Sequence, residues 1–427
     1  MSTDRNDRGQ ILVIVALASV ALMLVVGLVI DGGFAWSKRR EAQNAADLAA
    51  LAGTRVVAQN VAGTARTNQN VYNTLSTIAT ANNNSTIPGL GTASGALYVD
   101  SNGNPIAGLF VTNAATAIPA AARGVQVPAS RAWTPFFLGL ISVTNWTATA
   151  TATARTSVGA SAPCAFCVLG TAPLLAMQGA ATQLIVNNGA IAINSGLDMQ
   201  GNPTLQSTGT GAAINVFGTR LICNNCVPSP AVTPMTSPIP DPLAFLANPT
   251  ATGTNFGNVT SKGPNTTTTL NPGIYGTLDI TANATVLLNP GVYYFNGDVS
   301  PQSNGTLTGT NVTLVFMGQA NYKPQSNATV TITAPVATDT TATFPGLAMY
   351  FRRGNIGTLQ IQSSSVSRIN GTIYAPNAFL DMQSGSTLVT VNSMVIVGSA
   401  NVQAAKLTVN YTNSQNVQLP GAPSLVK

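Results

Sequence analysis

Residues 271–295 read NPGIYGTLDITANATVLLNPGVYYF, and this stretch repeats itself within its own length. The block Asn271-Pro272-Gly273-Ile274-Tyr275 returns eighteen residues later as Asn289-Pro290-Gly291-Val292-Tyr293. A period of about 20 residues without a helical segment is typical of a solenoid of β-coils. Asparagine and glycine suit the corners of such coils, where the backbone often turns left-handed. The stretch therefore predicts short strands stacked on one another.

The same kind of repetition extends over the second half of the chain. A Leu-x-Met-Gln block starts at Leu175, Leu197 and Leu380. An Asn-x-Thr-apolar unit starts at Asn283, Asn304, Asn311, Asn327 and Asn370. We therefore expect a mainly β protein whose body, residues 159–427, is a right-handed parallel β-helix. A β-sandwich is the alternative, because short strands at intervals of about 8–12 residues fit that architecture too.

A proline-rich segment interrupts the repeats. Residues 227–242 read VPSPAVTPMTSPIPDP and contain six prolines. Proline has no amide hydrogen to donate to a strand ladder, so the segment cannot be regular sheet. We expect a surface excursion or a hinge between two segments of the solenoid.

The N-terminal region is of a different kind. Ile11 to Ile30 is twenty residues long, carries no charge, and contains only one polar side chain, Ser19. As a helix it would extend about 30 Å, the thickness of the hydrocarbon core of a bilayer. The alternatives are a buried helix and a cleaved secretory signal, whose apolar part is usually only about 7–15 residues long. We predict a transmembrane helix from Ile11 to Ile30, preceded by a cytoplasmic tail of residues 1–10.

The helix is expected to continue beyond the apolar segment, to about residue 61. Small and apolar residues recur there at helical spacing and form one stripe. Small residues let helices approach closely, so we expect a close-packing face that meets partner proteins. Its members are Gly27, Ala45, Ala46, Ala49 and Ala52.

Charge is scarce and unevenly placed. Charged residues are 7% of the 427 residues, histidine is absent, and the formal net charge is +6. Six of the eighteen cations flank the apolar segment, and the others are scattered over the rest of the chain. A nucleic-acid-binding protein would gather its cations on one face. The composition therefore argues against a nucleic-acid partner and favours the lipid bilayer.

The N-terminal motifs resemble a known family. Arg8-Gly9-Gln10 precedes the apolar span, Gly27-Leu28-Val29-Ile30-Asp31-Gly32-Gly33 ends it, and RREAQNAADLAALAG follows at residues 39–53. Together they resemble the N-terminal domain of TadG-like Flp pilus-assembly proteins. The resemblance implies a bacterial single-pass protein of the cytoplasmic (inner) membrane, with pilus-assembly or pseudopilin-like membrane proteins as partners.

The orientation in the membrane rests on two arguments. The cations after the span (Lys38, Arg39 and Arg40) outnumber those before it, which alone would place the C-terminal side in the cytoplasm. Long domains, however, translocate largely regardless of charge. The charge-poor composition and the resemblance both favour an extracytoplasmic body, which comprises a small α+β region at 62–158 and the solenoid.

The four cysteines form two C-x-x-C pairs, Cys164 with Cys167 and Cys223 with Cys226. We expect disulfides, because an extracytoplasmic compartment is oxidising. Whether the bridges are local or link the two segments is open, and a four-thiolate zinc site or a catalytic dithiol are the alternatives. We expect no metal and no cofactor.

The residues for catalysis are also scarce. The body has six scattered aspartates after residue 160, no histidine and no glutamate. We therefore predict a non-enzymatic protein that assists assembly or anchoring of a Flp/Tad-type pilus. The alternative is a surface adhesin or glycan-binding β-helix protein independent of a pilus, with surface glycans as partners. A carbohydrate-active enzyme would require several of the aspartates to converge in one cleft.

Overall fold

The computed structural model describes residues 7–62, 66–82, 85–142, 144–156, 162–218, 221–224, 226–339, 341–362, 364–383, 387–412 and 416–426. The chain divides into two compact units, and each is treated by itself. We call Met1–Ala160 together with Pro420–Lys427 the anchor domain, and Ser161–Leu419 the solenoid. The C-terminal residues thus return to the domain in which the chain begins.

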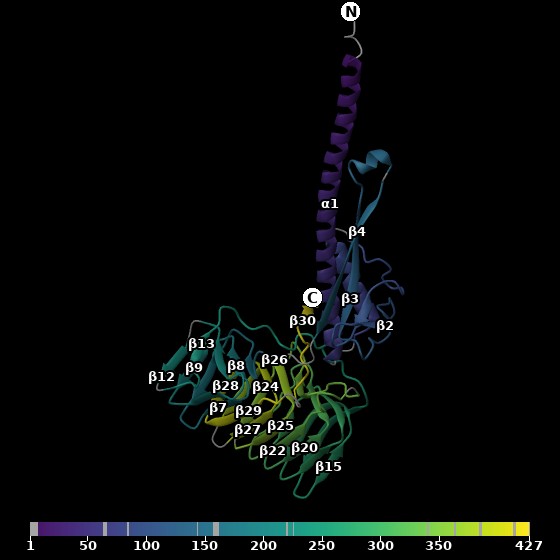
Figure 1. The fold of residues 1–427 in the computed structure, drawn as a ribbon. Helices are drawn as coiled ribbons and strands as arrows, with labels where there is room; N and C mark the ends of the chain where they lie inside the picture. Colours follow the sequence, from purple (N-terminus) through teal and green to yellow (C-terminus); the bar gives the residue numbers. More distant parts are fainter. Residues whose placement is uncertain are drawn as a thin grey trace, which may run out of the picture. The chain divides into compact units, whose positions relative to one another are not determined.

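The anchor domain consists of a long helix, a short helix and an antiparallel sheet (Figure 1). The sheet has the strand order β2-β1-β3-β4-β30. Its elements are α1 (Asp7–Val61), α2 (Asn68–Ala81), β1 (Leu97–Val99), β2 (Pro105–Phe110), β3 (Gly124–Trp133), the 3₁₀ turn η1 (Leu138–Ile141), β4 (Trp146–Thr156) and β30 (Pro423–Leu425).

The C-terminal half of α1 packs on this sheet and on α2 because its small residues permit a close approach. Ala45, Ala46 and Ala49 have no exposed surface, and neither does Leu75 of α2. A Cβ added to Gly53 would lie 2.6 Å from Cδ2 of Leu75, so the helix and its neighbour are already in contact there. The alternating Thr and Ala residues of β4 place alanines in the same core.

The solenoid winds in two stretches. The first stretch runs outward from the start of the body. Its strands are β5 (Phe166–Val168), β6 (Leu175–Gln178), β7 (Gln183–Asn187), β8 (Ala190–Ile193), β9 (Leu197–Gln200), β10 (Thr204–Thr208), β11 (Ala213–Val216), β12 (Leu221–Asn224) and β13 (Val232–Pro234).

The expectation that the proline-rich segment contains no regular sheet is wrong, because its residues Val232–Pro234 form β13, which pairs with β11 at the end of the longer sheet, where proline is tolerated. The second stretch begins after this segment. Its strands are β14 (Asn255–Lys262), β15 (Thr267–Leu270), β16 (Gly273–Thr281), β17 (Thr285–Leu288), β18 (Gly291–Phe295), β19 (Val299–Pro301), β20 (Thr306–Thr310), β21 (Val312–Phe316), β22 (Thr329–Thr333), β23 (Leu347–Phe351), β24 (Thr358–Gln362), β25 (Val366–Asn370), β26 (Thr372–Gln383), β27 (Thr387–Asn392), β28 (Val395–Gln403) and β29 (Ala405–Asn410).

The coils are not stacked in the order of the sequence. The longer sheet runs β13-β11-β8-β5-β28-β26-β23-β21-β18-β16-β14, and the nine-stranded sheet runs β10-β7-β29-β27-β25-β22-β20-β17-β15. The first coil of the body therefore pairs with the last, through β5 with β28 and β7 with β29. The second stretch starts at the far end of the stack and winds back toward the first (Figure 1).

Every strand pair among the described solenoid residues is parallel, as for β7 with β10 and β21 with β23. The predicted β-solenoid is confirmed, with eleven strands along the path of its longer sheet. The alternative of a β-sandwich is wrong, because sandwich sheets are antiparallel. Four of the five asparagines of the Asn-x-Thr units lie at corners, with a backbone φ between 58° and 63° at Asn283, Asn304, Asn311 and Asn327. The fifth, Asn370, is instead the last residue of strand β25.

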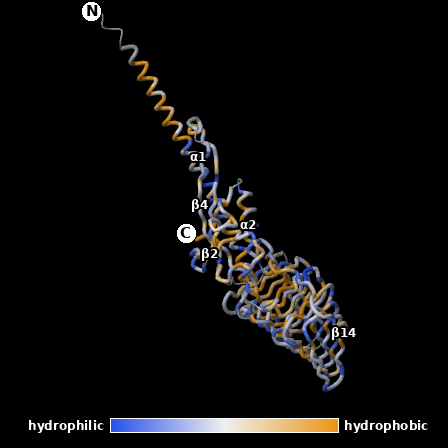
Figure 2. Tube along the Cα trace, turned by 90° about the vertical axis from the view of Figure 1, so that its right-hand side faces the viewer, coloured by the Kyte–Doolittle hydropathy of each residue, from blue (hydrophilic) through white to orange (hydrophobic). Residues whose placement is uncertain are grey.

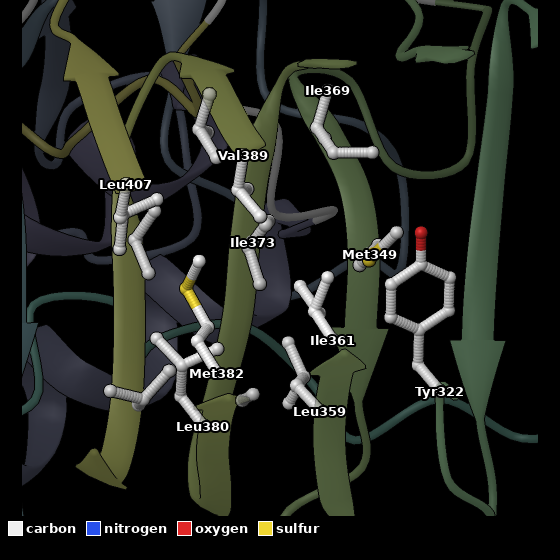
Figure 3. Packing of buried hydrophobic residues seen from close by; sticks show 14 of the residues in the cluster. Tyr322, Met349, Leu359, Ile361, Ile369, Ile373, Leu380, Met382, Val389 and Leu407 are labelled. Atoms are coloured by element: carbon white, nitrogen blue, oxygen red, sulfur yellow. The ribbon is translucent and has the colours of Figure 1, made fainter. Parts of the chain in front are cut away.

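In the interior of the solenoid, side chains of the same kind from successive strands stack on one another. Leucine, isoleucine and valine side chains from successive strands point inward, with Met349 and Met382 among them (Figure 3). The hydroxyl of Tyr322 reaches into this core and lies 3.1 Å from the hydroxyl of Ser367. One aromatic column joins Tyr275, Phe295, Phe316 and Phe351, with centroid spacings of 5.7, 6.0 and 4.3 Å.

Candidate functional site: the anchor helix and the polar ladders

The N-terminal half of α1 has almost no protein contact. Between Ile11 and Ile30 every residue except Gly27 is exposed, and the large apolar side chains range from 38% exposed at Ile30 to 73% at Leu12. Among the described residues α1 is the helix that is long and apolar enough to cross a membrane. Figure 2 shows this part as an apolar stretch of the tube. Apolar side chains exposed on all sides of one helix are typical of a bilayer-spanning segment.

The span ends at a contact with the hairpin of β3 and β4. Asp31 has no exposed surface, and its carboxylate accepts hydrogen bonds from the backbone N–H groups of Phe136, Phe137 and Leu138 at 2.8–3.3 Å. These groups open the turn η1, whose first N–H groups have no partner within the turn. A Cβ added to Gly27 would lie 2.8 Å from Cβ and Cγ of Phe137.

The predicted packing face of α1 is therefore occupied within the chain. Gly27 faces Phe137, while Ala45, Ala46 and Ala49 are fully buried and Ala52 is half-buried. Phe137 contacts this face at Gly27, and the sheet and α2 cover its alanines, while contact with partner proteins stays a prediction. The small residues of this face indicated close packing, but the sequence did not indicate which surface packs against them.

The cysteines form two local disulfides, Cys164 with Cys167 and Cys223 with Cys226. Cys164 and Cys167 are fully buried, and Cys167 lies on β5 at the junction of the first and last coils. Each bridge closes only two intervening residues, so neither links the two cysteine-bearing segments. The two pairs thus do not combine into a four-thiolate site.

Three side chains that the sequence did not single out as a group fix the proline-rich segment to the solenoid. The guanidinium of Arg353 donates to the carbonyls of Leu243 and Leu246 at 2.7 Å and to the hydroxyl of Tyr374 at 2.8 Å. That hydroxyl donates in turn to the carboxylate of Asp241 at 2.6 Å. Burial, reinforced by this carboxylate, raises the pKa of Tyr374. We call Arg353, Tyr374 and Asp241 the clamp.

An unbroken ladder of amides and hydroxyls runs along the nine-stranded sheet. Successive members lie one strand apart and are joined by hydrogen bonds of 2.6–3.0 Å. The members, in spatial order, are Thr333, Asn370, Asn392, Asn410, Asn187 and Thr208. Because each amide both donates and accepts, the ladder satisfies polar groups without any charge.

The repeated Leu-x-Met-Gln blocks form a second ladder. Residues 380–382 pair with residues 400–402, and residues 401–403 pair with residues 176–178. The block Leu175-Ala176-Met177-Gln178 then pairs with Leu197-Asp198-Met199-Gln200. All three blocks therefore share one register, although about 180 residues separate the second from the third. Asp381 accepts hydrogen bonds from Gln383 at 2.8 Å and Asn401 at 3.0 Å.

The aspartates of the solenoid do not converge. Asp298 pairs with Lys323 at 2.6 Å, Asp339 closes a turn at Thr341, and Asp241 belongs to the clamp. The described residues contain no group of three or more His, Cys, Asp or Glu side chains that could hold a metal ion. These positions assign the carboxylates to turns, ladders and ion pairs.

A groove of about 500 Å³ lies along one corner of the solenoid. Its lining combines aromatic rings, amide and hydroxyl groups, and a carboxylate. The relevant residues are Tyr294, Phe344, Asn311, Thr313 and Asp339.

Comparison with known proteins identifies the N-terminal part. Residues 9–65 match the Tad family of Flp pilus-assembly TadE/G-like domains. Neither a curated protein nor a solved structure matches the chain. The matched residues cover the apolar span and all of its helical continuation to Val61, and the resemblance seen in the sequence is confirmed. The chain therefore carries a TadE/G-like Flp pilus-assembly domain at its N-terminus, followed by a β-rich body.

Proposed function

We propose that this protein is a single-pass protein of the bacterial cytoplasmic (inner) membrane that assists assembly or anchoring of a Flp/Tad-type pilus without catalysing a reaction. The observation that carries the proposal is the TadE/G-like domain at residues 9–65, which coincides with an exposed apolar helix. The body lies outside the cytoplasm. The two disulfides support this side, because such bonds persist in oxidising compartments.

A structural role fits the chemistry of the solenoid. Its surface groups are tied to one another in ladders, and its carboxylates are dispersed over turns and ion pairs. A rigid stack of this kind resists bending, since each coil hydrogen-bonds to both neighbours. The solenoid acts as a spacer or a docking body and not as a catalyst.

Deletion of the gene in the native bacterium tests the pilus role. We expect surface pili, counted by electron microscopy and by the pilin content of the sheared fraction, to be lost and then restored by the full chain. A variant in which Leu17, Leu22 and Leu24 are replaced by aspartate should fail to restore them, because it cannot span the bilayer. Normal piliation in the deletion strain would refute the role.

Topology is tested separately. Alkaline phosphatase, which is active only outside the cytoplasm, is fused after residue 160. We expect high phosphatase activity, whereas the same fusion before residue 7 should be inactive. The reverse pattern would place the body in the cytoplasm and overturn the localisation.

A second candidate function is adhesion to glycans. The groove lined by Tyr294, Phe344 and Asp339 favours it, because sugars bind through apolar ring contacts together with a few placed polar groups. An adhesin predicts that the deletion strain keeps its pili but loses attachment to a glycan-coated surface. The genes beside this one add an independent criterion, since a pilus role predicts pilin and secretion ATPase genes nearby.

A further inference from the structure

The tip of the β3–β4 hairpin lies beside the membrane-spanning part of α1. Phe137 packs over Gly27, which is three residues before the end of the apolar span at Ile30. At 1.5 Å per residue this contact is about 4.5 Å inside that end. The hairpin thus reaches the level of the last turn of the span.

Exposed aromatic side chains occur in the tip and on α1 just beyond the end of the span, where Phe34 and Trp36 follow Ile30 by four and six residues. Phe136, beside Phe137 in the tip, is 73% exposed, and its ring lies 5.1 Å from that of Phe137. On α1, Phe34 is 53% and Trp36 is 66% exposed. Trp146, at the neck of the hairpin, stacks on Trp133 and is 37% exposed. Aromatic residues of this kind concentrate at the boundary between hydrocarbon and headgroups.

The basic residues complete the arrangement. Lys38, Arg39 and Arg40 follow Trp36 within one turn of α1, and the last two are exposed. Cations in this position attract anionic headgroups over a distance of about one Debye length. From the span outward, the order is apolar residues, aromatic residues and cations, which is the order of environments in one leaflet.

Asp31 allows the loop of the hairpin to lie next to lipid. Irregular backbone exposed to lipid is unfavourable because its N–H groups have no partner. Here three successive N–H groups, those of Phe136, Phe137 and Leu138, donate to the carboxylate of Asp31. The buried carboxylate gains its partners from the same contact, so neither group is left unsatisfied.

We infer that the tip of the β3–β4 hairpin is a second membrane-contacting element, with Phe136 inserted at the acyl–headgroup boundary of the leaflet in which the apolar span ends. The partner is the lipid surface itself. Asp31 positions the tip, and Phe34, Trp36 and Trp146 lie at headgroup level around it. The anchor domain is then attached at two points, which restricts its rotation about α1. This inference rests on the proposed membrane span and holds for either orientation of the chain.

The test uses the full chain in vesicles of phosphatidylcholine and phosphatidylglycerol. The three tryptophans, Trp36, Trp133 and Trp146, are first replaced by phenylalanine. Phe136→Trp is then added as the only fluorophore of its kind. We expect a blue-shifted emission that loses most of its intensity to lipids brominated near the headgroup end of the acyl chain, and little to aqueous acrylamide.

Two control variants are made in the same background, in which the three natural tryptophans are phenylalanine. Thr77→Trp lies on the exposed side of α2, near the level of Gly53 and about 39 Å further along α1 than Gly27, and should respond only to acrylamide. Leu22→Trp lies in the span and should respond to deeply brominated lipids. If position 136 behaves like position 77 while position 22 is quenched by lipid, the inference is wrong and the span stands. If position 22 also responds to acrylamide, the span itself is refuted.

The role of Asp31 has its own readout. Asp31→Ala should make the indole at position 136 accessible to acrylamide, while quenching at position 22 stays unchanged. Asp31→Asn keeps one acceptor oxygen and should retain part of the protection. Unchanged protection in Asp31→Ala would show that the carboxylate does not position the hairpin.

Discussion

In the anchor domain, one long helix packs its small residues on a sheet of different sequence, whereas in the solenoid each strand packs on another strand of similar sequence. The first core depends on the fit between unlike surfaces, as where Leu75 and Val125 approach Gly53. The second depends on equal spacing, as in the aromatic column from Tyr275 to Phe351. A destabilising substitution in the anchor domain is therefore one that makes two elements clash. In the solenoid it is one that leaves a gap in a column of stacked side chains.

The largest effect is expected from a gap in the aromatic column. Phe316 is fully buried between Phe295 and Phe351. Phe316→Ala removes contacts on both sides, and the free energy of unfolding should fall by about 3–5 kcal/mol. Urea denaturation of the full chain in detergent micelles, followed by far-ultraviolet circular dichroism, measures it. Ile356→Ala, at a residue that is 71% exposed, should change it by no more than about 0.5 kcal/mol. Equal effects would contradict the column.

A clash in the anchor domain ranks second. Gly53→Val places a Cβ 2.6 Å from Cδ2 of Leu75 and 3.0 Å from Cγ2 of Val125. Because both contacts are with the ends of side chains and not with backbone, we expect a loss of about 1–3 kcal/mol. Tryptophan fluorescence reports it, since Trp36, Trp133 and Trp146 all lie in the anchor domain.

Gly33→Val is the matched control for this clash. No atom lies within 4 Å of a Cβ at Gly33, so the substitution meets open space on the same helix. Its unfolding transition should stay close to that of the unmodified chain. If both valines were equally harmful, helix propensity rather than packing would explain the result.

A break in the asparagine ladder should lower the free energy of unfolding by less than Phe316→Ala or Gly53→Val does. Asn392 donates to Asn370 at 2.6 Å and accepts from Asn410 at 2.9 Å. Asn392→Ala removes both bonds, each with a net contribution of about 0.5–1.5 kcal/mol, so we expect a loss of about 1–2 kcal/mol. Amide hydrogen exchange on β25 and β29 should rise. Thr390→Ala, two residues away on the same strand, should leave this exchange nearly unchanged.

The smallest expected effect is on the pH dependence of the free energy of unfolding. Partial burial raises the pKa of Asp298, but the hydrogen bonds from Lys323 and Asn321 lower it by more, and the net pKa lies below its ordinary value. The resulting stabilisation is present above the unfolded-state pKa of about 3.9 and is lost as the pH falls through the folded-state pKa. Lys323→Met should reduce this loss below about pH 4 in thermal melts. Because the pair is about one-third exposed, the difference should be small. An identical acid-induced loss in Lys323→Met would argue against the ion pair as its cause.

Much of this architecture was predictable because its signals are local. A period of about 20 residues requires a coil, whatever lies elsewhere in the chain. Asn283 and Asn304 marked corners because asparagine tolerates the left-handed backbone conformation that a tight turn needs. The local bridges of the cysteines were one of the arrangements left open, since spacing alone cannot choose between local and distant pairs.

The candidate site was less predictable. The small residues of α1 indicated close packing, yet a stripe of alanines is equally compatible with another protein and with the chain's own sheet. Phe137 could not be assigned to Gly27, because about 110 residues separate them in the sequence. The clamp of Arg353, Tyr374 and Asp241 was likewise hidden, since its members come from three distant segments.

The sequence by itself determined the apolar span, the β-coils and their corners, because each depends on residues within about one period of the chain. Only the tertiary structure decided which coil lies on which. The segment after β13 carries the chain to the far end of the stack, so the last coil meets the first and the Leu-x-Met-Gln blocks at residues 175 and 380 share one ladder. Coils of similar sequence present similar strand edges, so the local sequence does not determine which coils pair. Contacts between residues far apart in the chain determine it. For the same reason the hairpin tip came to lie beside Asp31, where a buried carboxylate and three unpaired N–H groups satisfy one another.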